Sequence, residues 1–167
     1  MPAGHLAAAS ELEVVLMATD PGTWATRPTL AGTFSRRMVA AAVDEARAMS
    51  LAVTVVTVDE SGVLKELYRM DGAPLVSVQT AMSKAYAAAA VGMPPDDFYA
   101  AIESDGAAVA SFATRPGLAL IGGGIPVVAD GRVAGAIGVA GAMTSAEDRR
   151  IAEAAVDQVQ RPGGSAP

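Results

Sequence analysis

The chain has 167 residues, a formal net charge of −6, no cysteine and one histidine. This length suits one domain with an ordinary core, and the acidity argues against nucleic acid, which proteins bind by neutralising phosphates. The missing cysteines exclude disulfides, thiolate nucleophiles and cysteine-based metal sites. No loop pattern for a carboxylate metal site is seen, so we expect no bound metal ion. No apolar run is long enough for a membrane helix and no leader pattern is seen, so we expect a cytoplasmic protein that does not bind a membrane.

Residues 1–28 are predicted to form an N-terminal extension. An apolar stretch at 6–18 predicts one short helix, and Asp20-Pro21-Gly22 predicts a turn. Trp24, the only tryptophan, could cover a pocket or anchor the extension to a domain surface. His5 is interpreted as a solvated residue near the terminus rather than a catalytic base.

The first half of the domain is predicted to be a helix, a hairpin and a second helix. The first helix is capped by Thr29 or Thr33, and its apolar residues recur at spacings of three and four. Residues 51–58 and 63–70 predict two strands joined by a turn at 59–62. Residues 76–91 predict an alanine-rich helix that ends at Gly92.

The second half is predicted to contain further helices and a second group of strands. A helix opens at Pro94-Pro95 and ends before Gly106, and 107–113 form a short helical turn. Residues 118–121 are expected to begin the sheet again. Asp130-Gly131 predicts a tight hairpin, Thr144 or Ser145 caps a last helix, and 160–167 are predicted to be a disordered tail.

The strand after this hairpin has one unusually small face. Alternation of side chains places Val133, Ile137 and Val139 on one face, whereas the other carries only small residues, namely Ala134, Ala136, Gly138 and Ala140. Glycine inside a strand is typical of close approach by another element. Either the 76–91 helix or a flat ligand should therefore lie against this face.

Runs of strands separated by runs of helices favour an α+β layered fold with an antiparallel sheet. The chain shows no internal repeat. We place the domain at 29–159.

Several motifs within the domain resemble one known family. They are Val58-Asp59-Glu60-Ser61-Gly62, Arg69-Met70-Asp71-Gly72-Ala73, Ser83-Lys84-Ala85, Gly122-Gly123-Gly124-Ile125-Pro126 and Gly135-Ala136-Ile137-Gly138-Val139-Ala140-Gly141. In this order they resemble the GlcG/HbpS family, which includes the C-terminal domain of PduO-type corrinoid adenosyltransferases. The resemblance implies a profilin-like or PAS-like five-stranded antiparallel sheet flanked by helices, and homo-oligomers that are dimers or larger. Characterised relatives bind haem or serve beside corrinoid enzymes, and many others have no settled activity.

Two functions with a small-molecule partner fit these residues. A third interpretation, an assembly or accessory subunit without a ligand, would apply if side chains fill the pocket. In the first, the domain binds haem or another tetrapyrrole near the 76–91 helix. Consecutive glycine N–H groups can bind an anion, and methionine sulfur can ligate haem iron. The ligand-binding residues would be Gly122, Gly123, Gly124, Pro126, Gly138 and Met70.

In the second function, the pocket belongs to a metal-free enzyme of the isomerase or lyase type. It would move a proton on a small carboxylate or carbonyl metabolite, with Arg69 orienting the acid through its planar guanidinium and Lys84, Asp71 or a tyrosine moving the proton.

Each of these residues also has a structural interpretation. Arg69 could pair with Asp71, and Lys84 could extend along the alanine-rich helix to water. The three glycines could form a β-bulge, and Met70 could fill a gap in the core. The sequence leaves these alternatives open.

Overall fold

The computed structural model describes residues 26–160. The predicted helix at 6–18, Trp24, His5 and the predicted tail beyond residue 160 lie outside the described residues. The elements in chain order are α2 (Gly32–Ala48), β1 (Thr54–Asp59), β2 (Leu64–Arg69), α3 (Val76–Val91), α4 (Pro95–Ile102), α5 (Gly106–Ala113), β3 (Gly124–Ala129), β4 (Arg132–Ala140) and α6 (Ser145–Gln160). In this range, no helix combines the length and apolarity that crossing a bilayer requires.

The four strands form one antiparallel sheet in the order β2-β1-β4-β3. The α+β class is confirmed, but the expectation of five strands is wrong for the described residues. The segment expected to begin the second group of strands, 118–121, has no regular structure. It leads into a turn at Gly123, which has a φ of +116°, and pairing with β4 starts only there, where the Val139 N–H donates to the Gly123 carbonyl at 2.8 Å.

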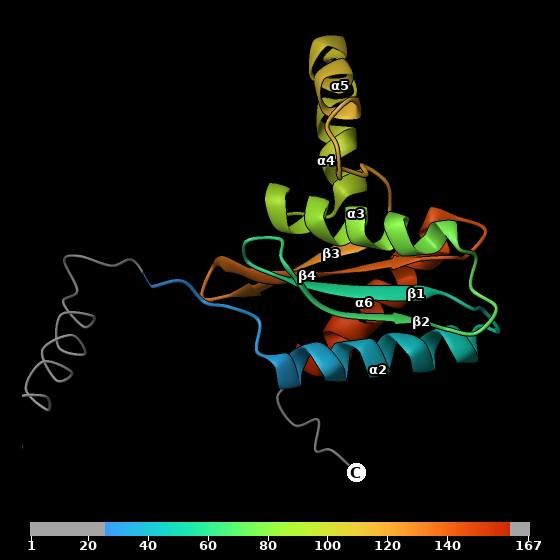
Figure 1. The fold of residues 1–167 in the computed structure, drawn as a ribbon. Coiled ribbons are helices and arrows are strands. Elements are labelled where there is room, and N and C mark those ends of the chain that lie inside the picture. The colour runs from blue at the N-terminus through green and yellow to red at the C-terminus, as the bar shows by residue number, and fades with distance from the viewer. Residues whose placement is uncertain (1–25, 161–167) are drawn as a thin grey trace, which may run out of the picture.

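Helices cover both faces of the sheet (Figure 1). Helix α3 lies on one face, against valines of β1 and alanines of β4. Helices α2 and α6 lie on the other face, where they bury the larger apolar core that includes Met38, Ile137 and Ile151. Helices α4 and α5 extend away from the sheet beyond α3 (Figure 1).

The small face of β4 lies directly beneath α3, as the sequence predicts. A Cβ at Gly138 would lie 2.2 Å from the Ala81 carbonyl oxygen and 2.6 Å from the Ala85 nitrogen. Because both atoms belong to the helix backbone, only glycine fits at position 138. The prediction that α3 and this strand are in close contact is therefore confirmed.

The predicted hairpin is also confirmed, with one correction to its strand. Asp130 and Gly131 have φ values of +50° and +73°, as a tight turn between antiparallel strands requires. Just beyond the turn, β4 contains an irregularity in its pairing with β3, so that Val133 packs against the α3-side cluster. Val133 was predicted on the face of Ile137 and Val139; the extra residue of the bulge places it on the opposite face.

Candidate functional site

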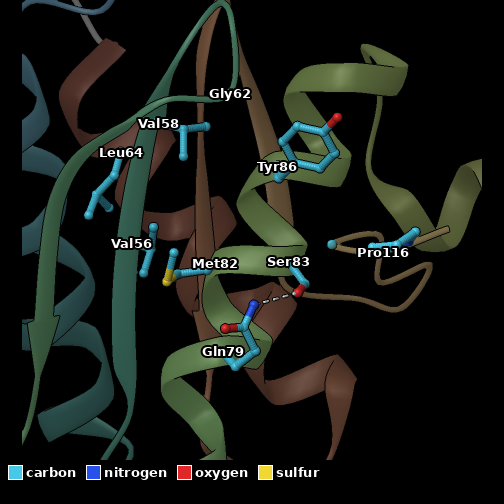
Figure 2. Close-up of a pocket in the computed structure, with 10 residues that line it drawn as sticks. Val56, Val58, Gly62, Leu64, Gln79, Met82, Ser83, Tyr86 and Pro116 are labelled. Atoms are coloured by element: carbon cyan, nitrogen blue, oxygen red, sulfur yellow. Dashed lines mark hydrogen bonds between the residues drawn. The ribbon is translucent and has the colours of Figure 1, made fainter.

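An apolar groove runs between α3 and the first hairpin. Its volume is about 340 Å³, and ten residues line it: Val56, Val58, Gly62, Leu64, Gln79, Met82, Ser83, Tyr86, Pro116 and Gly117. We call this the apolar groove. Figure 2 shows its floor of β1 valines and its wall of α3 side chains, with Met82 on the side of Val56. A cavity of this size suits a ligand of drug-like dimensions.

The groove exists because α3 crosses β1 and β4 and leaves β2 uncovered. Valines 56 and 58 are fully or almost fully buried beneath α3, whereas Leu64 on β2 is 47% exposed. The polar members of the groove, Gln79 and Ser83, lie one helical turn apart on α3 and share a hydrogen bond of 3.4 Å (Figure 2). The groove thus has an apolar floor and a polar edge.

Tyr86 closes one end of the groove. Its ring lies against Gly62 in the β1–β2 turn, where an added Cβ would be 2.6 Å from Cδ2 of the ring. Gly117 lies on the other side, with an added Cβ 3.9 Å from Cδ1. Two glycines on different loops therefore leave room for one aromatic ring.

At the other side of α3, Lys84 forms a buried ion pair with Asp148. The side chain of Lys84 is 1% exposed, and its Nζ donates to Asp148 Oδ2 at 2.7 Å and to the Val139 carbonyl at 3.1 Å. The second carboxylate oxygen of Asp148 accepts from the Ala142 N–H at 3.1 Å. Burial raises the pKa of the Asp148 carboxyl above its ordinary value, although the hydrogen bond and charge of Lys84 act in the opposite direction.

Gly123 provides the space through which Lys84 reaches Asp148. A Cβ at Gly123 would lie 2.9 Å from Lys84 Nζ and 2.9 Å from the Cβ of Asp148. The pair therefore connects α3 on one face of the sheet to α6 on the other, past the point where β3 begins.

A second cavity, of about 260 Å³, reaches this ion pair. We call it the polar hollow. Its lining comes from the start of α3, the segment before β3 and the loop from β4 to α6: Pro74, Val76, Ser77, Thr80, Lys84, Ile121, Ala140, Gly141, Ala142, Met143, Thr144, Ser145 and Asp148. The polar hollow therefore combines a buried acid and base with hydroxyl groups.

The other residues predicted for the enzyme lie apart from the ion pair. Arg69 donates from Nε to the Ala73 carbonyl at 3.0 Å, so its guanidinium closes the turn that follows β2. Asp71 is exposed in that turn. Of the three predicted catalytic residues, only Lys84 lines the polar hollow.

The residues predicted to bind a ligand are also distributed over the fold. Met70 packs against the core between the sheet and the α2–α6 layer, away from α3. Pro126 lies on β3, an edge strand, where its missing N–H leaves no gap in the sheet. The space beside Gly138 is filled by α3.

The glycine cluster approaches protein groups rather than an open cavity. An added Cβ at Gly122 would lie 2.8 Å from the Ser145 carbonyl oxygen, and one at Gly124 would lie 2.4 Å from that of Lys84. The three glycines thus allow the chain to pass between α3 and α6. Among residues 26–160, no three His, Cys, Asp or Glu side chains are grouped so that they could hold a metal ion.

Arg149, the residue after Asp148, attaches α4 to α6. It donates to Asp96 at 2.7 Å, to Asp97 at 2.6 Å and to Glu153 at 2.7 Å. These hydrogen bonds raise the pKa of Arg149, and the bond to Arg149 lowers the pKa of Asp97.

Sequence reasoning missed Asp148 and the groove. Asp148 looks like an ordinary acid in the first turn of a helix, and nothing in the spacing indicates that it meets a lysine 64 residues earlier. The signal that was available is Lys84 itself, since a lone lysine within an alanine-rich helix that packs on a sheet needs a buried partner.

Comparisons with known proteins place the chain in a family. The family model described as "Haem degrading protein HbpS-like" matches residues 33–157, so the chain belongs to the HbpS-like family. The resemblance inferred from the motifs is thereby confirmed. Protein GlcG of Escherichia coli is 33% identical over 114 residues, which cover 68% of this chain and 83% of GlcG.

Solved structures show the same fold. The crystal structure of a double mutant of Streptomyces reticuli HbpS has a TM-score of 0.76 and 28% identity, over 83% of this chain and 92% of HbpS. A structure titled as a complex of PduOC with haem has a TM-score of 0.71 and 25% identity, over 77% of this chain and 94% of the other.

Proposed function

We propose that this protein binds a flat, largely apolar small molecule of the tetrapyrrole class, haem among them, in the apolar groove. The single observation that carries the proposal is the groove itself, an open apolar slot of about 340 Å³ between α3 and β2. A flat ligand gains most of its binding free energy by burying its faces against such apolar walls.

The family supports this choice of ligand. The matching family model is named for haem degradation, and one similar structure is described as a haem complex. Both statements concern relatives, and they select haem from the flat apolar ligands that the groove would accept.

The groove residues fit the chemistry of haem at three points. Leu64 and Tyr86, which are 47% and 41% exposed, offer an apolar surface for the macrocycle above the buried β1 valines, and Gln79 and Ser83 offer hydrogen bonds to carboxylate groups. Haem would supply an iron centre, for which the Met82 thioether is the soft ligand in the groove. Met70 packs in the opposite layer, and Met93 is 40% exposed beyond α3 and does not line the groove.

Metal-free proton transfer on a small carboxylate or carbonyl metabolite is the second candidate function. One observation favours it, namely that the buried Lys84–Asp148 pair reaches the polar hollow. A base and an acid at 2.7 Å can exchange a proton with a molecule bound beside them.

The test of tetrapyrrole binding uses two neighbouring leucine and valine positions. Leu64 lines the apolar groove and is 47% exposed, whereas Val63 is 59% exposed and does not line it. We expect haemin to shift its Soret band and to raise the melting temperature of the wild-type protein. Leu64→Glu should weaken haemin binding about tenfold or more, because the carboxylate loses water inside an apolar site; Val63→Glu should change it little.

Two results would contradict the proposal. One is the absence of both a Soret shift and thermal stabilisation in the wild-type protein. The other is equal haemin affinity in Leu64→Glu and Val63→Glu, which would place any binding outside the apolar groove.

A further inference from the structure

The buried Lys84–Asp148 pair has the parts of a nucleophile and its base. We propose that Lys84 forms a Schiff base with small aldehydes and ketones that enter the polar hollow, with Asp148 taking the proton of its ammonium group. This activity is separate from tetrapyrrole binding, because the polar hollow and the apolar groove share no lining residue.

The contacts of Lys84 allow its proton to move to Asp148. Nζ lies 2.7 Å from Asp148 Oδ2, a distance over which a proton can be shared. Lys84 is 1% exposed, and Asp148 is 4% exposed. Burial raises the pKa of the Asp148 carboxyl, which makes this carboxylate a better proton acceptor than an exposed aspartate.

Once its proton has passed to Asp148 across the 2.7 Å contact, the amine of Lys84 is a competent nucleophile. Desolvated lysines in enclosed pockets are a known source of reactive amines. The Val139 carbonyl, 3.1 Å from Nζ, accepts one of the N–H bonds and so orients the amine. The Ala142 N–H, 3.1 Å from Asp148 Oδ1, holds the carboxyl group in place.

The reaction balances without a cofactor. Lys84 transfers one proton to Asp148, and its lone pair forms a carbon–nitrogen bond to the carbonyl carbon. The carbonyl oxygen takes one proton from the attacking nitrogen and one from Asp148, and it leaves as one water molecule. The products are a protonated imine on Lys84, paired with the Asp148 carboxylate, and water, so no oxidant or reductant takes part.

The size and lining of the polar hollow limit the substrate. About 260 Å³ admits a carbonyl compound of a few carbon atoms. Its mouth is apolar and open, since Val76 is 72% exposed and Met143 is 93% exposed. Ser77 and Thr80 add polar residues to its lining. This combination favours a short aliphatic aldehyde or ketone, whose alkyl end lies toward the mouth.

The chain offers an internal control for a trapping experiment. Its only other lysine is Lys65, which is exposed on β2. The full-length protein is incubated with propanal and sodium cyanoborohydride, which reduces an imine to a stable propyl-lysine, and the two sites are quantified by peptide mass spectrometry. We expect modification of Lys84 to saturate as propanal is increased, because a complex forms first, whereas modification of Lys65 rises linearly.

Variants separate the proposed base from general effects of charge. Asp148→Asn should slow modification of Lys84 about tenfold or more, as is typical when a general base is lost, and leave Lys65 unchanged. Glu103→Gln, which removes an exposed carboxylate, should alter neither rate.

Two outcomes would overturn the proposal. Lys84 could stay unmodified while Lys65 reacts, which would make the ion pair purely structural. Modification of Lys84 could instead rise linearly with the propanal concentration, as that of Lys65 does. This would show that Lys84 reacts without first binding propanal. Both are read from the wild-type protein, so the test stands even if Asp148→Asn fails to fold. A loss of haemin binding would not affect either reading.

Discussion

Gly138 shows how one residue sets the spacing of the two layers. A Cβ there would lie 2.2 Å from a backbone oxygen of α3, and backbone atoms cannot rotate out of the way. The close contact of α3 with β4 defines where the helix lies and, with it, the walls of both cavities.

We therefore expect Gly138→Ala to destabilise the protein by about 3 kcal/mol or more, because the methyl group forces α3 away from the sheet. The measurement is the free energy of unfolding in urea. Gly32→Ala is the matched control, since an added Cβ at this first residue of α2 meets nothing within 4 Å. It should leave stability unchanged or raise it by up to about 1 kcal/mol. Equal effects of the two substitutions would contradict the close contact.

Single residues were predictable where the chain itself imposes the constraint. Asp130-Gly131 and Gly138 could be interpreted from local pattern, since a turn and a glycine within a strand have few alternatives. Asp148, the partner of Lys84, could not be predicted, because it lies on α6 and meets Lys84 only where the two elements come together beside Gly123. The same holds for Tyr86, whose contacts with Gly62 and Gly117 join three separate segments.

At the scale of elements, α4 and α5 are the least buried helices of the described chain. None of the residues of α5 is buried, and Pro95 alone is buried in α4. Phe98 and Phe112 connect the two helices through an edge-to-face contact with ring centroids 5.1 Å apart. The bonds of Arg149 to Asp96 and Asp97 are thus prominent among the contacts that attach this pair of helices to the body.

We expect Arg149→Met to release α4 without unfolding the domain. Amide hydrogen exchange over 95–102 should become several times faster, while the free energy of unfolding falls by no more than about 1 kcal/mol, as is usual for partly exposed ion pairs. Arg150→Met, which removes an exposed partner of Glu45 at 3.4 Å, is the control and should leave α4 unchanged.

Lowering the pH should also weaken the attachment of α4, and amide hydrogen exchange over 95–102 should become faster. The lowered pKa of Asp97 means that its bond to Arg149 stabilises the fold above the ordinary aspartate pKa of about 4 and is lost as pH falls through the lowered value. Unchanged exchange of α4 in Arg149→Met would contradict this account of its attachment.

Most elements could be predicted from the sequence because their signals are local. Helix α3 has the predicted bounds, and Pro95 and Asp96 mark the start of α4 as expected. The expected strand at 118–121 failed because a short apolar run needs a partner strand, and pairing with β4 begins only at the Gly123 turn. The apolar groove could not be predicted, since it depends on α3 leaving β2 uncovered.

At the scale of the whole molecule, α3 separates two cavities with different chemistry. The apolar groove lies on its β2 side and the polar hollow on its α6 side. The family and the α+β fold agree with the sequence analysis. The domain bounds at 29–159, the homo-oligomer and the cytoplasmic location stay predictions. Leu30, which is 3% exposed and donates its N–H to the Ala134 carbonyl, indicates that the folded unit begins at or before residue 30.

The most direct test of the central claim is to map a tetrapyrrole onto the protein by NMR. Zinc protoporphyrin, a diamagnetic analogue of haem, is titrated into the ¹⁵N-labelled full-length chain. We predict saturable shifts of the amide signals of Val58, Leu64, Met82 and Tyr86, with those of Gly141 and Met143 at the polar hollow unchanged. Shifts confined to the polar hollow, or no shifts at all, would contradict the assignment of the apolar groove as the ligand site.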